Sequence, residues 1–132
     1  MSPRGELVKV LPMDARLRAG VHLFNAGRYF ESHESLEEFY LRTEEKHKPF
    51  LEGLIELAAA LRLFSDFGEV KGPVRMVHQA IIRLENYQPA YLGIKVRDLI
   101  HTMEAWVGQV QAENGASPGG VPQIRLRRFI FF

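Results

Sequence analysis

Apolar residues recur at helical spacing along most of the chain and predict five helices. In the first, Leu17, Val21 and Phe24 fall on one face, Asp14 suits the N-cap and Gly27 suits the end. The remaining four helices are expected over residues 29–46, 49–67, 73–87 and 94–113. The third is apolar nearly all round, which is typical of a central helix covered on several sides. Five helices with short connections indicate a compact all-α bundle.

The two ends of the chain have a different pattern. Residues 6–11 and 123–132 alternate like short strands, and residues 114–120 have the composition of a flexible linker. The two strand-like segments could pair as a small ribbon against the bundle or exchange between subunits. The tail closes on Phe-Ile-Phe-Phe, which we expect to dock on an apolar surface. The expected divisions are an N-terminal extension, a helical domain, and a linker with its tail, at 1–12, 13–113 and 114–132.

Composition excludes several kinds of site. The 132 residues include no cysteine, which rules out disulfides and thiolate zinc sites. The longest apolar stretch, 54–64, is interrupted by Glu56 and Arg62 and is too short to cross a bilayer. Together with an N-terminus that lacks an apolar leader pattern, this predicts a cytoplasmic protein with no membrane partner.

Charge argues against nucleic acid as a partner. The formal net charge is only +1, so no overall field attracts a polyanion. A local excess occurs near the C-terminus, at Arg125, Arg127 and Arg128. Three arginines are a small footprint for a nucleic acid, and we expect this tail to pair with an acidic helix surface instead.

The segment 30–41 places ionisable groups where a helix should be apolar. At about 100° per residue, its apolar side chains define one arc, formed by Phe30, Leu36, Phe39, Tyr40 and Leu41. His33 and Glu37 fall inside this arc, and Glu34 lies at its edge. Carboxylates and imidazoles are rarely buried unless they are paired, hydrogen-bonded or bound to metal. We therefore expect a buried His/Glu cluster, with Glu31 as a capping or supporting residue.

The third predicted helix offers another carboxylate. Gly53, Glu56 and Ala60 share one face, so Glu56 lies between two small residues that allow close helix approach. We expect this face to meet the helix over 29–46 and to bring Glu56 beside His33 and Glu37.

The cluster suits a buried polar network, a small-molecule or acid/base site, or a partial metal site. If the helix is rotated from this orientation, Glu37 and Glu38 instead belong to a solvated face. Di-iron bundles repeat a Glu-x-x-His pattern on two helices, whereas here no second helix carries a matching histidine. We therefore predict no cofactor, and His33, Glu34 and Glu37 are only candidate ligands. A structural network is the preferred interpretation of the cluster.

Two stretches, 23–37 and 50–61, resemble a known family. Their common features are a Phe-Asn-x-Gly-x-Tyr-Phe-Glu-x-His-Glu run and a following Gly-Leu-Ile helix. The chain is similar, over roughly 20–107, to the small helical proteins of domain-of-unknown-function family three hundred and nine. The resemblance implies an all-α bundle with the two motif helices packed together, and implies no activity. The matching positions are Asn25, Gly27, Glu31, His33, Glu34, Glu37 and Gly53.

Two positions depart from the family pattern. Tyr40 stands where a tryptophan often follows the His-Glu segment, and Glu56 stands where a glutamine is common. An amide at the latter position would favour a hydrogen-bond network over a metal site.

Three functions are compatible with this sequence. The preferred one is a binding or structural module whose polar pocket is lined by the cluster, namely His33, Glu34, Glu37, Glu56, Glu31, Asn25 and Tyr40. A hydrolase using His33, Glu34 and Glu37 is the enzymatic alternative, so the residues do not decide whether the protein is an enzyme. An interaction module that forms a homodimer through the C-terminal tail is the third. An unidentified small molecule is the expected ligand of the pocket.

Overall fold

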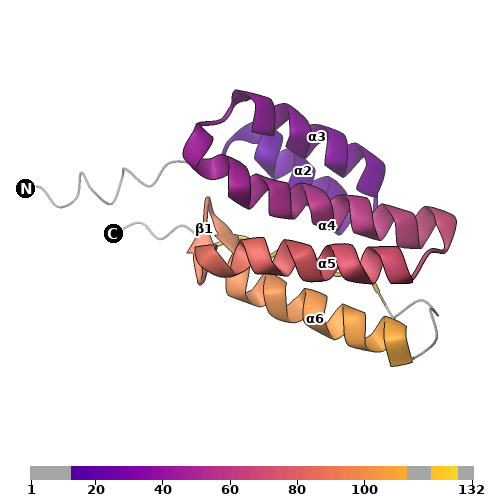
Figure 1. Cartoon of the computed structure of the whole chain (residues 1–132). Helices are drawn as coiled ribbons and strands as arrows, with labels where there is room; N and C mark the ends of the chain where they lie inside the picture. Colours follow the sequence, from indigo (N-terminus) through magenta and orange to yellow (C-terminus); the bar gives the residue numbers. More distant parts are fainter. Residues whose placement is uncertain (1–12, 113–119, 128–132) are drawn as a thin grey trace, which may run out of the picture.

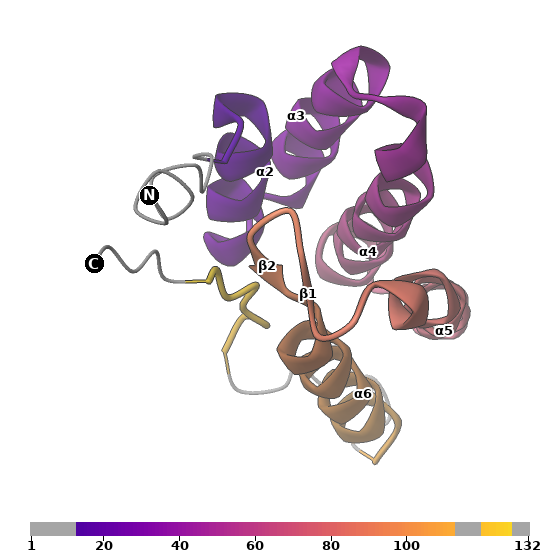
Figure 2. The ribbon, with the colours of Figure 1, turned by 90° about the vertical axis from the view of Figure 1, so that its left-hand side faces the viewer.

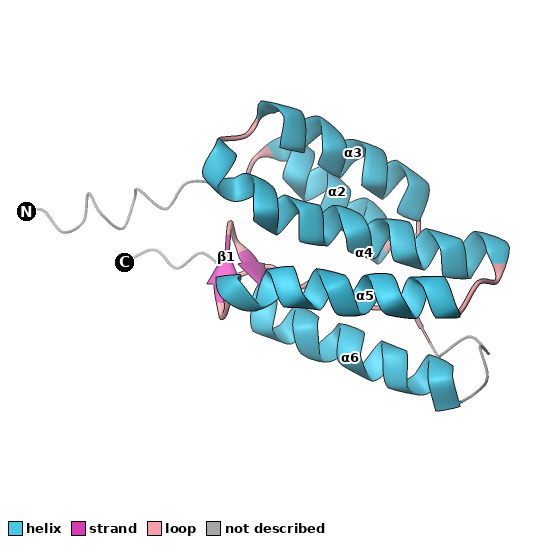
Figure 3. Ribbon diagram, viewed as in Figure 1, coloured by secondary structure: helices cyan, strands magenta, loops and turns pink. Residues whose placement is uncertain are grey.

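The computed structural model describes residues 13–112 and 120–127, and within them the all-α prediction is confirmed. Five α-helices account for most of these residues: α2 (Ala15–Asn25), α3 (Tyr29–Arg42), α4 (Lys48–Phe67), α5 (Lys71–Leu84) and α6 (Val96–Ala112). They are coloured by secondary structure in Figure 3. The predicted strand at 6–11, most of the linker and the Phe-Ile-Phe-Phe end lie outside the described residues. No described helix is long and apolar enough to cross a membrane.

Successive helices pack against one another, with α3 and α6 at opposite sides of the molecule and α4 and α5 between them (Figures 1 and 2). The core is continuous through the bundle. As its composition predicts, α4 is central: it contacts both α3 and α5, and its buried residues cover about half of its circumference. Burying apolar side chains on several sides is the main term that stabilises this helix.

Local signals define the start of α2 and the end of α4. Asp14 caps α2, because its Oδ1 accepts a hydrogen bond from the Arg16 backbone amide at 2.8 Å. Burial alone would raise the pKa of Asp14, but the hydrogen bonds from Arg16 outweigh it and hold the pKa below its usual value. Gly68 ends α4 in the left-handed region, with φ of 70°, where a side chain would be strained. The N-cap prediction at Asp14 is therefore confirmed.

A hairpin that the sequence pattern did not reveal lies between α5 and α6. Strands β1 (Ala90–Tyr91) and β2 (Ile94–Lys95) pair antiparallel around Leu92 and Gly93, which both have positive φ. Positive φ at both central residues is the signature of a type I′ turn. The periodicity predicted helix from residue 94 onward, but α6 begins only at Val96.

The C-terminal segment 120–127 lies beside this hairpin in the manner of a third strand. Leu126 forms an antiparallel bridge with Ile94. The Lys95 amide donates to the Arg125 carbonyl at 2.9 Å, and the Arg127 amide donates to the Gly93 carbonyl at 2.7 Å. The described part of the tail therefore docks on its own chain, against a hairpin rather than against the acidic helix surface that we expected.

Candidate functional site

A pair of hydrogen bonds holds the tail to the end of α2. The Asn25 side-chain Nδ2 donates to the Ile124 carbonyl at 3.0 Å, and the Ile124 amide donates to Asn25 Oδ1 at 2.7 Å. The amide side chain thus satisfies both backbone groups of Ile124, as a neighbouring strand would. The side chain of Ile124 is buried in the core. Asn25 therefore fixes the C-terminal segment 120–127, which pairs with the hairpin, to the end of α2.

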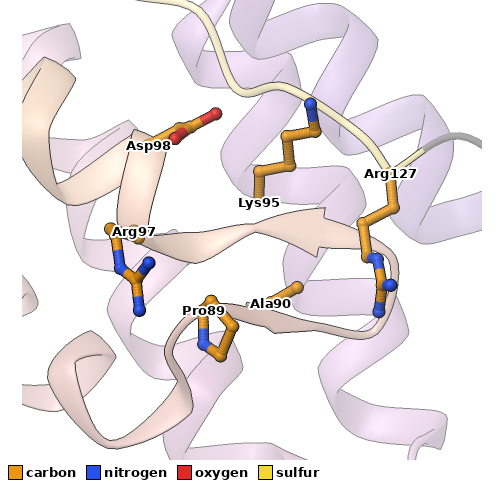
Figure 4. A pocket seen from close by; sticks show the side chains of 6 residues that line it. All are labelled: Pro89, Ala90, Lys95, Arg97, Asp98 and Arg127. Atoms are coloured by element: carbon orange, nitrogen blue, oxygen red, sulfur yellow. The ribbon is translucent and has the colours of Figure 1, made fainter.

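The clamped segment closes one side of a pocket. The pocket has a volume of about 420 Å³ and lies between the hairpin, the first turn of α6 and the tail. Figure 4 shows its lining residues: Pro89, Ala90, Lys95, Arg97, Asp98 and Arg127. A pocket of this size is within the range that holds small molecules. It exists only because three segments of the chain meet at one place.

Positive charge dominates this pocket. Lys95 comes from β2, Arg97 from α6 and Arg127 from the tail, and Asp98 is the one carboxylate among the described lining residues. The formal sum of these four side chains is +2. The start of α6 adds the positive end of its helix dipole. The pocket is therefore suited to an anion that carries about two negative charges.

The predicted His/Glu cluster is not buried. Glu34 and Glu37 are exposed and His33 is half-buried, so the inward placement of these groups was wrong. Two large apolar side chains on the expected arc, Phe30 and Leu41, are 45% and 76% exposed. Because these two residues were counted as buried, the predicted apolar arc included a face of the helix that is exposed to solvent.

The face of α3 that is buried contains Tyr29, Ser32, Leu36 and Phe39. Ser32 donates from Oγ to the Gly20 carbonyl of α2 at 2.8 Å, and it is fully buried. A Cβ on Gly20 would lie 2.6 Å from Leu36 Cδ2, so α2 and α3 approach closely there. This contact fixes the rotation of α3 about its axis, and a serine hydroxyl takes the place predicted for charged groups. In the sequence, Gly20 and Ser32 were the signal for this close contact between α2 and α3. Glycine and serine are also common at protein surfaces, so the sequence alone did not single them out.

Two other predicted site residues form an ion pair or a hydrogen bond near the surface. Glu31 accepts a hydrogen bond from Arg28 at 2.8 Å, which holds the pKa of Glu31 below its usual value. Tyr40 donates from its hydroxyl to Glu52 at 3.0 Å, and this bond raises the pKa of Tyr40. Neither residue points at the pocket described above.

The expected partner of the Gly53 face was also wrong. A Cβ on Gly53 would meet Leu84 Cδ2 at 3.0 Å and the Ala80 carbonyl at 3.5 Å, so this face packs on α5 rather than on α3. Glu56 Oε1 lies 3.6 Å from Arg83 Nε, also on α5. Glu56 therefore forms its ion pair with Arg83 of α5, on the face of α4 that turns away from the predicted His33 and Glu37 cluster. Arg83 also binds Glu52 at 3.0 Å, which links α4 to α5.

These positions bear on the metal and hydrolase alternatives. Among the described residues, no group of three or more histidine, aspartate or glutamate side chains is arranged to hold a metal ion. His33, Glu34 and Glu37 therefore do not form the ligand set that the metal-assisted hydrolase requires. The buried cluster on which that alternative depended is absent from this part of the chain.

A histidine to which the sequence assigned no role anchors the hairpin. His47, in the short 3-10 turn η1 (Glu45–His47), lies 2.6 Å by its Nδ1 from the Tyr91 hydroxyl. The Tyr91 ring packs edge-on against Phe50, with ring centroids 4.9 Å apart. Burial raises the pKa of Tyr91. This contact ties β1 to the start of α4 and so supports one wall of the cationic pocket.

The family resemblance can be tested by comparison with known proteins. Residues 17–76 match a family described as Domain of unknown function (DUF309). Over this span the chain is similar to DUF309. The DUF309 match includes α2, α3, α4 and the first turns of α5, and it confirms the family predicted from the two motifs. None of the curated proteins compared with the chain matches it.

Of the two residues whose hydrogen bonds hold the tail to α2, only one lies within the span that matches DUF309. Asn25 lies within the matched residues, whereas Ile124 and all the residues that line the cationic pocket lie beyond them. The pocket is thus built by the part of the chain that follows the DUF309 match and docks on it.

Proposed function

We propose that this protein binds a small phosphomonoester in the pocket between the hairpin, α6 and the tail. The observation that carries the proposal is that three cations, Lys95, Arg97 and Arg127, come from three separate segments to line one pocket of about 420 Å³. Figure 4 shows them at different parts of its edge, with Arg97 and Arg127 toward opposite ends of the hairpin. Bringing like charges together costs Coulomb energy, which a bound anion offsets.

The charge balance favours a phosphomonoester over a monoanion. Such a group carries between one and two negative charges at neutral pH, because its second pKa is about 6. The formal charge of the lining side chains is +2, from three cations and Asp98. Arginine offers planar pairs of donors that suit phosphate oxygens. Asp98 supplies an acceptor for a hydroxyl group on the organic part of the ligand.

The proposed role is binding and not catalysis. Among its described lining residues, the pocket has one carboxylate, no histidine and no serine or threonine hydroxyl, so these residues offer no hydroxyl nucleophile with a histidine base. The absence of cysteine supports action in the cytoplasm. This proposal keeps the preference for a binding module while moving the site away from His33 and Glu37.

The test is a titration of the full chain, ¹⁵N-labelled, with inorganic phosphate and with glycerol phosphate, followed by NMR. We expect amide shifts confined to residues 89–98 and 120–127, with glycerol phosphate binding more tightly than phosphate because Asp98 can accept its hydroxyl. Glycerol is the uncharged control and should cause no shifts.

Two variants in the tail separate a built pocket from general surface charge. Arg127→Gln should weaken binding of glycerol phosphate about tenfold, because it removes a cation from the pocket lining. Arg125→Gln removes the same charge from an exposed side chain of the same segment that does not line the pocket, and should leave affinity unchanged. Equal losses in both variants, or equal shifts with glycerol, would reject the proposal.

A further inference from the structure

A second concave surface lies between α5 and α6. This groove has a volume of about 560 Å³, and its floor and sides are lined by Val70, Lys71, Val74, Arg75, His78, Gln79, Ile82, Val110 and Gln111. Ile82 at its edge is 66% exposed. The surface therefore has the apolar floor and polar rim of a helix-binding groove.

The rim of the groove carries charge of one sign. Lys71, Arg75 and His78 follow one another along α5, and no carboxylate is among the described residues that line the groove. Along the helix, the order is apolar at Val70, basic in the middle and apolar again at Ile82. The occupant that this order fits is a helix with apolar ends and an acidic middle.

The outward face of α3 is such a helix. Its exposed side chains are Phe30, Glu31, Glu34, Glu37, Glu38 and Leu41, followed by Arg42 at the last position of the helix. Apolar side chains lie at the two ends and four carboxylates lie between them. Part of this face has contacts within its own chain, since Glu31 binds Arg28 and the Arg62 guanidinium lies over the Phe30 ring at 4.5 Å. Glu34, Glu37 and Leu41 are exposed beside these contacts.

The two surfaces also agree in length. At about 1.5 Å per residue, the stripe from Phe30 to Leu41 spans roughly 17 Å, and the side of the groove from Val70 to Ile82 spans roughly 18 Å. We infer that the outward face of α3 in one copy binds in the α5–α6 groove of a second copy. Because α3 and α6 lie at opposite sides of the molecule (Figures 1 and 2), the contact joins two different surfaces and is heterologous.

A heterologous contact permits a decisive mixing experiment. In a groove variant, Lys71→Glu and Arg75→Glu reverse the basic rim; in a face variant, Glu34→Gln, Glu37→Gln and Leu41→Ser remove the acidic and apolar features of α3. Sedimentation velocity of the full chain over a concentration series should show reversible association of the unmodified protein, weakened by added salt. Each variant alone should associate at least tenfold more weakly.

Mixed in equal amounts, the two variants should form a one-to-one dimer. The intact α3 face of the groove variant can then bind the intact groove of the face variant, and no further copy can add. All five substituted positions are exposed, so far-UV circular dichroism should show unchanged folding. Arg125→Glu, a single charge reversal of the same kind at an exposed tail residue outside both surfaces, is the control and should associate normally.

Three results would overturn the inference. These are a protein that stays monomeric at all concentrations, variants that associate as the unmodified protein does, and a mixture that does not associate.

Discussion

Asn25 and Ile124 are joined by two hydrogen bonds across 99 residues of sequence, one from each partner. The contact connects the last residue of α2 with the segment that completes the hairpin layer. It makes the tail part of the folded domain and places Arg127 at the edge of the pocket that Lys95 and Arg97 also line. The integrity of the cationic pocket consequently depends on a residue in the first helix.

Replacing Asn25 should release the tail. In Asn25→Ala the Ile124 amide and carbonyl lose their partners, and we expect a loss of about 1–3 kcal/mol in the free energy of unfolding. Urea denaturation measures this loss, and amide hydrogen exchange should show the Ile124 amide losing protection before the core of α4. Gln123→Ala removes a more exposed bond to the Asn25 carbonyl and should cost less than 0.5 kcal/mol, as is usual for surface changes. Unchanged Ile124 exchange in Asn25→Ala would contradict the clamp.

Close packing of α2 on α3 should make Gly20 intolerant of a side chain. In Gly20→Ala the new Cβ would lie 2.6 Å from Leu36 Cδ2, and the resulting shift should destabilise the protein by about 1–3 kcal/mol. Gly108→Ala is the matched control, because a Cβ there meets nothing within 4 Å and lies in a helix. That change should be neutral or stabilising by up to about 1 kcal/mol. Thermal unfolding of both variants should give shifts of opposite sign, and similar shifts would show that the helices are not in such close contact.

The rotation of α3 about its axis can be tested by comparing the loss of stability when Ser32 is replaced with the loss when Glu34 and Glu37 are replaced. Ser32→Ala leaves the buried Gly20 carbonyl without its side-chain partner and should cost about 1–2 kcal/mol. Glu34→Ala and Glu37→Ala together change only exposed side chains and should stay within about 0.5 kcal/mol of the unmodified protein. Denaturant midpoints distinguish the two cases. A larger loss from the glutamate pair than from Ser32→Ala would restore the buried His/Glu cluster and reject the present placement.

Stability should fall at alkaline pH as Tyr29 ionises. Burial raises the pKa of Tyr29 to about 12, compared with 10.0 for an exposed tyrosine, because the phenolate would lose its hydration. The folded state therefore favours the neutral form, and this contribution is complete below pH 10 and is lost as the pH rises through 12. The shift corresponds to about 2–3 kcal/mol.

The control for this alkaline loss is Tyr29→Phe. This variant keeps the ring beside Phe24, where the centroids are 5.3 Å apart, and removes the ionisable hydroxyl. Its free energy of unfolding should fall less steeply between pH 10 and pH 12 than that of the unmodified protein. Identical alkaline slopes would show that Tyr29 does not titrate late in the folded state.

The helices could be predicted because their signals are local. Asp14 as an N-cap, Gly68 as a stop and the apolar circumference of α4 each depend on residues within a few positions of one another. The same locality explains the errors at helix ends. The predicted helix over 29–46 stops at Arg42, and the one over 73–87 gives way to the 3-10 turn η2 (Glu85–Tyr87).

The candidate site could not be predicted in the same way. A helical wheel gives the spacing of His33 and Glu37 around α3 but not the direction in which that helix faces, and exposed Phe30 and Leu41 made the wrong face look buried. The direction is decided by where Ser32 and Leu36 meet Gly20. The pocket required still more distant information, because no local pattern links Arg127 with Lys95.

Residue spacing was therefore sufficient for the all-α class, the centrality of α4 and the DUF309 motifs, since burial of an apolar stripe and backbone capping act within one helix. Tertiary contacts alone decided which face of α3 is buried, that Glu56 pairs with Arg83, and that the tail meets Asn25. The physical reason is that these outcomes depend on side chains brought together from distant positions, where close packing and the need to satisfy buried backbone groups select one arrangement.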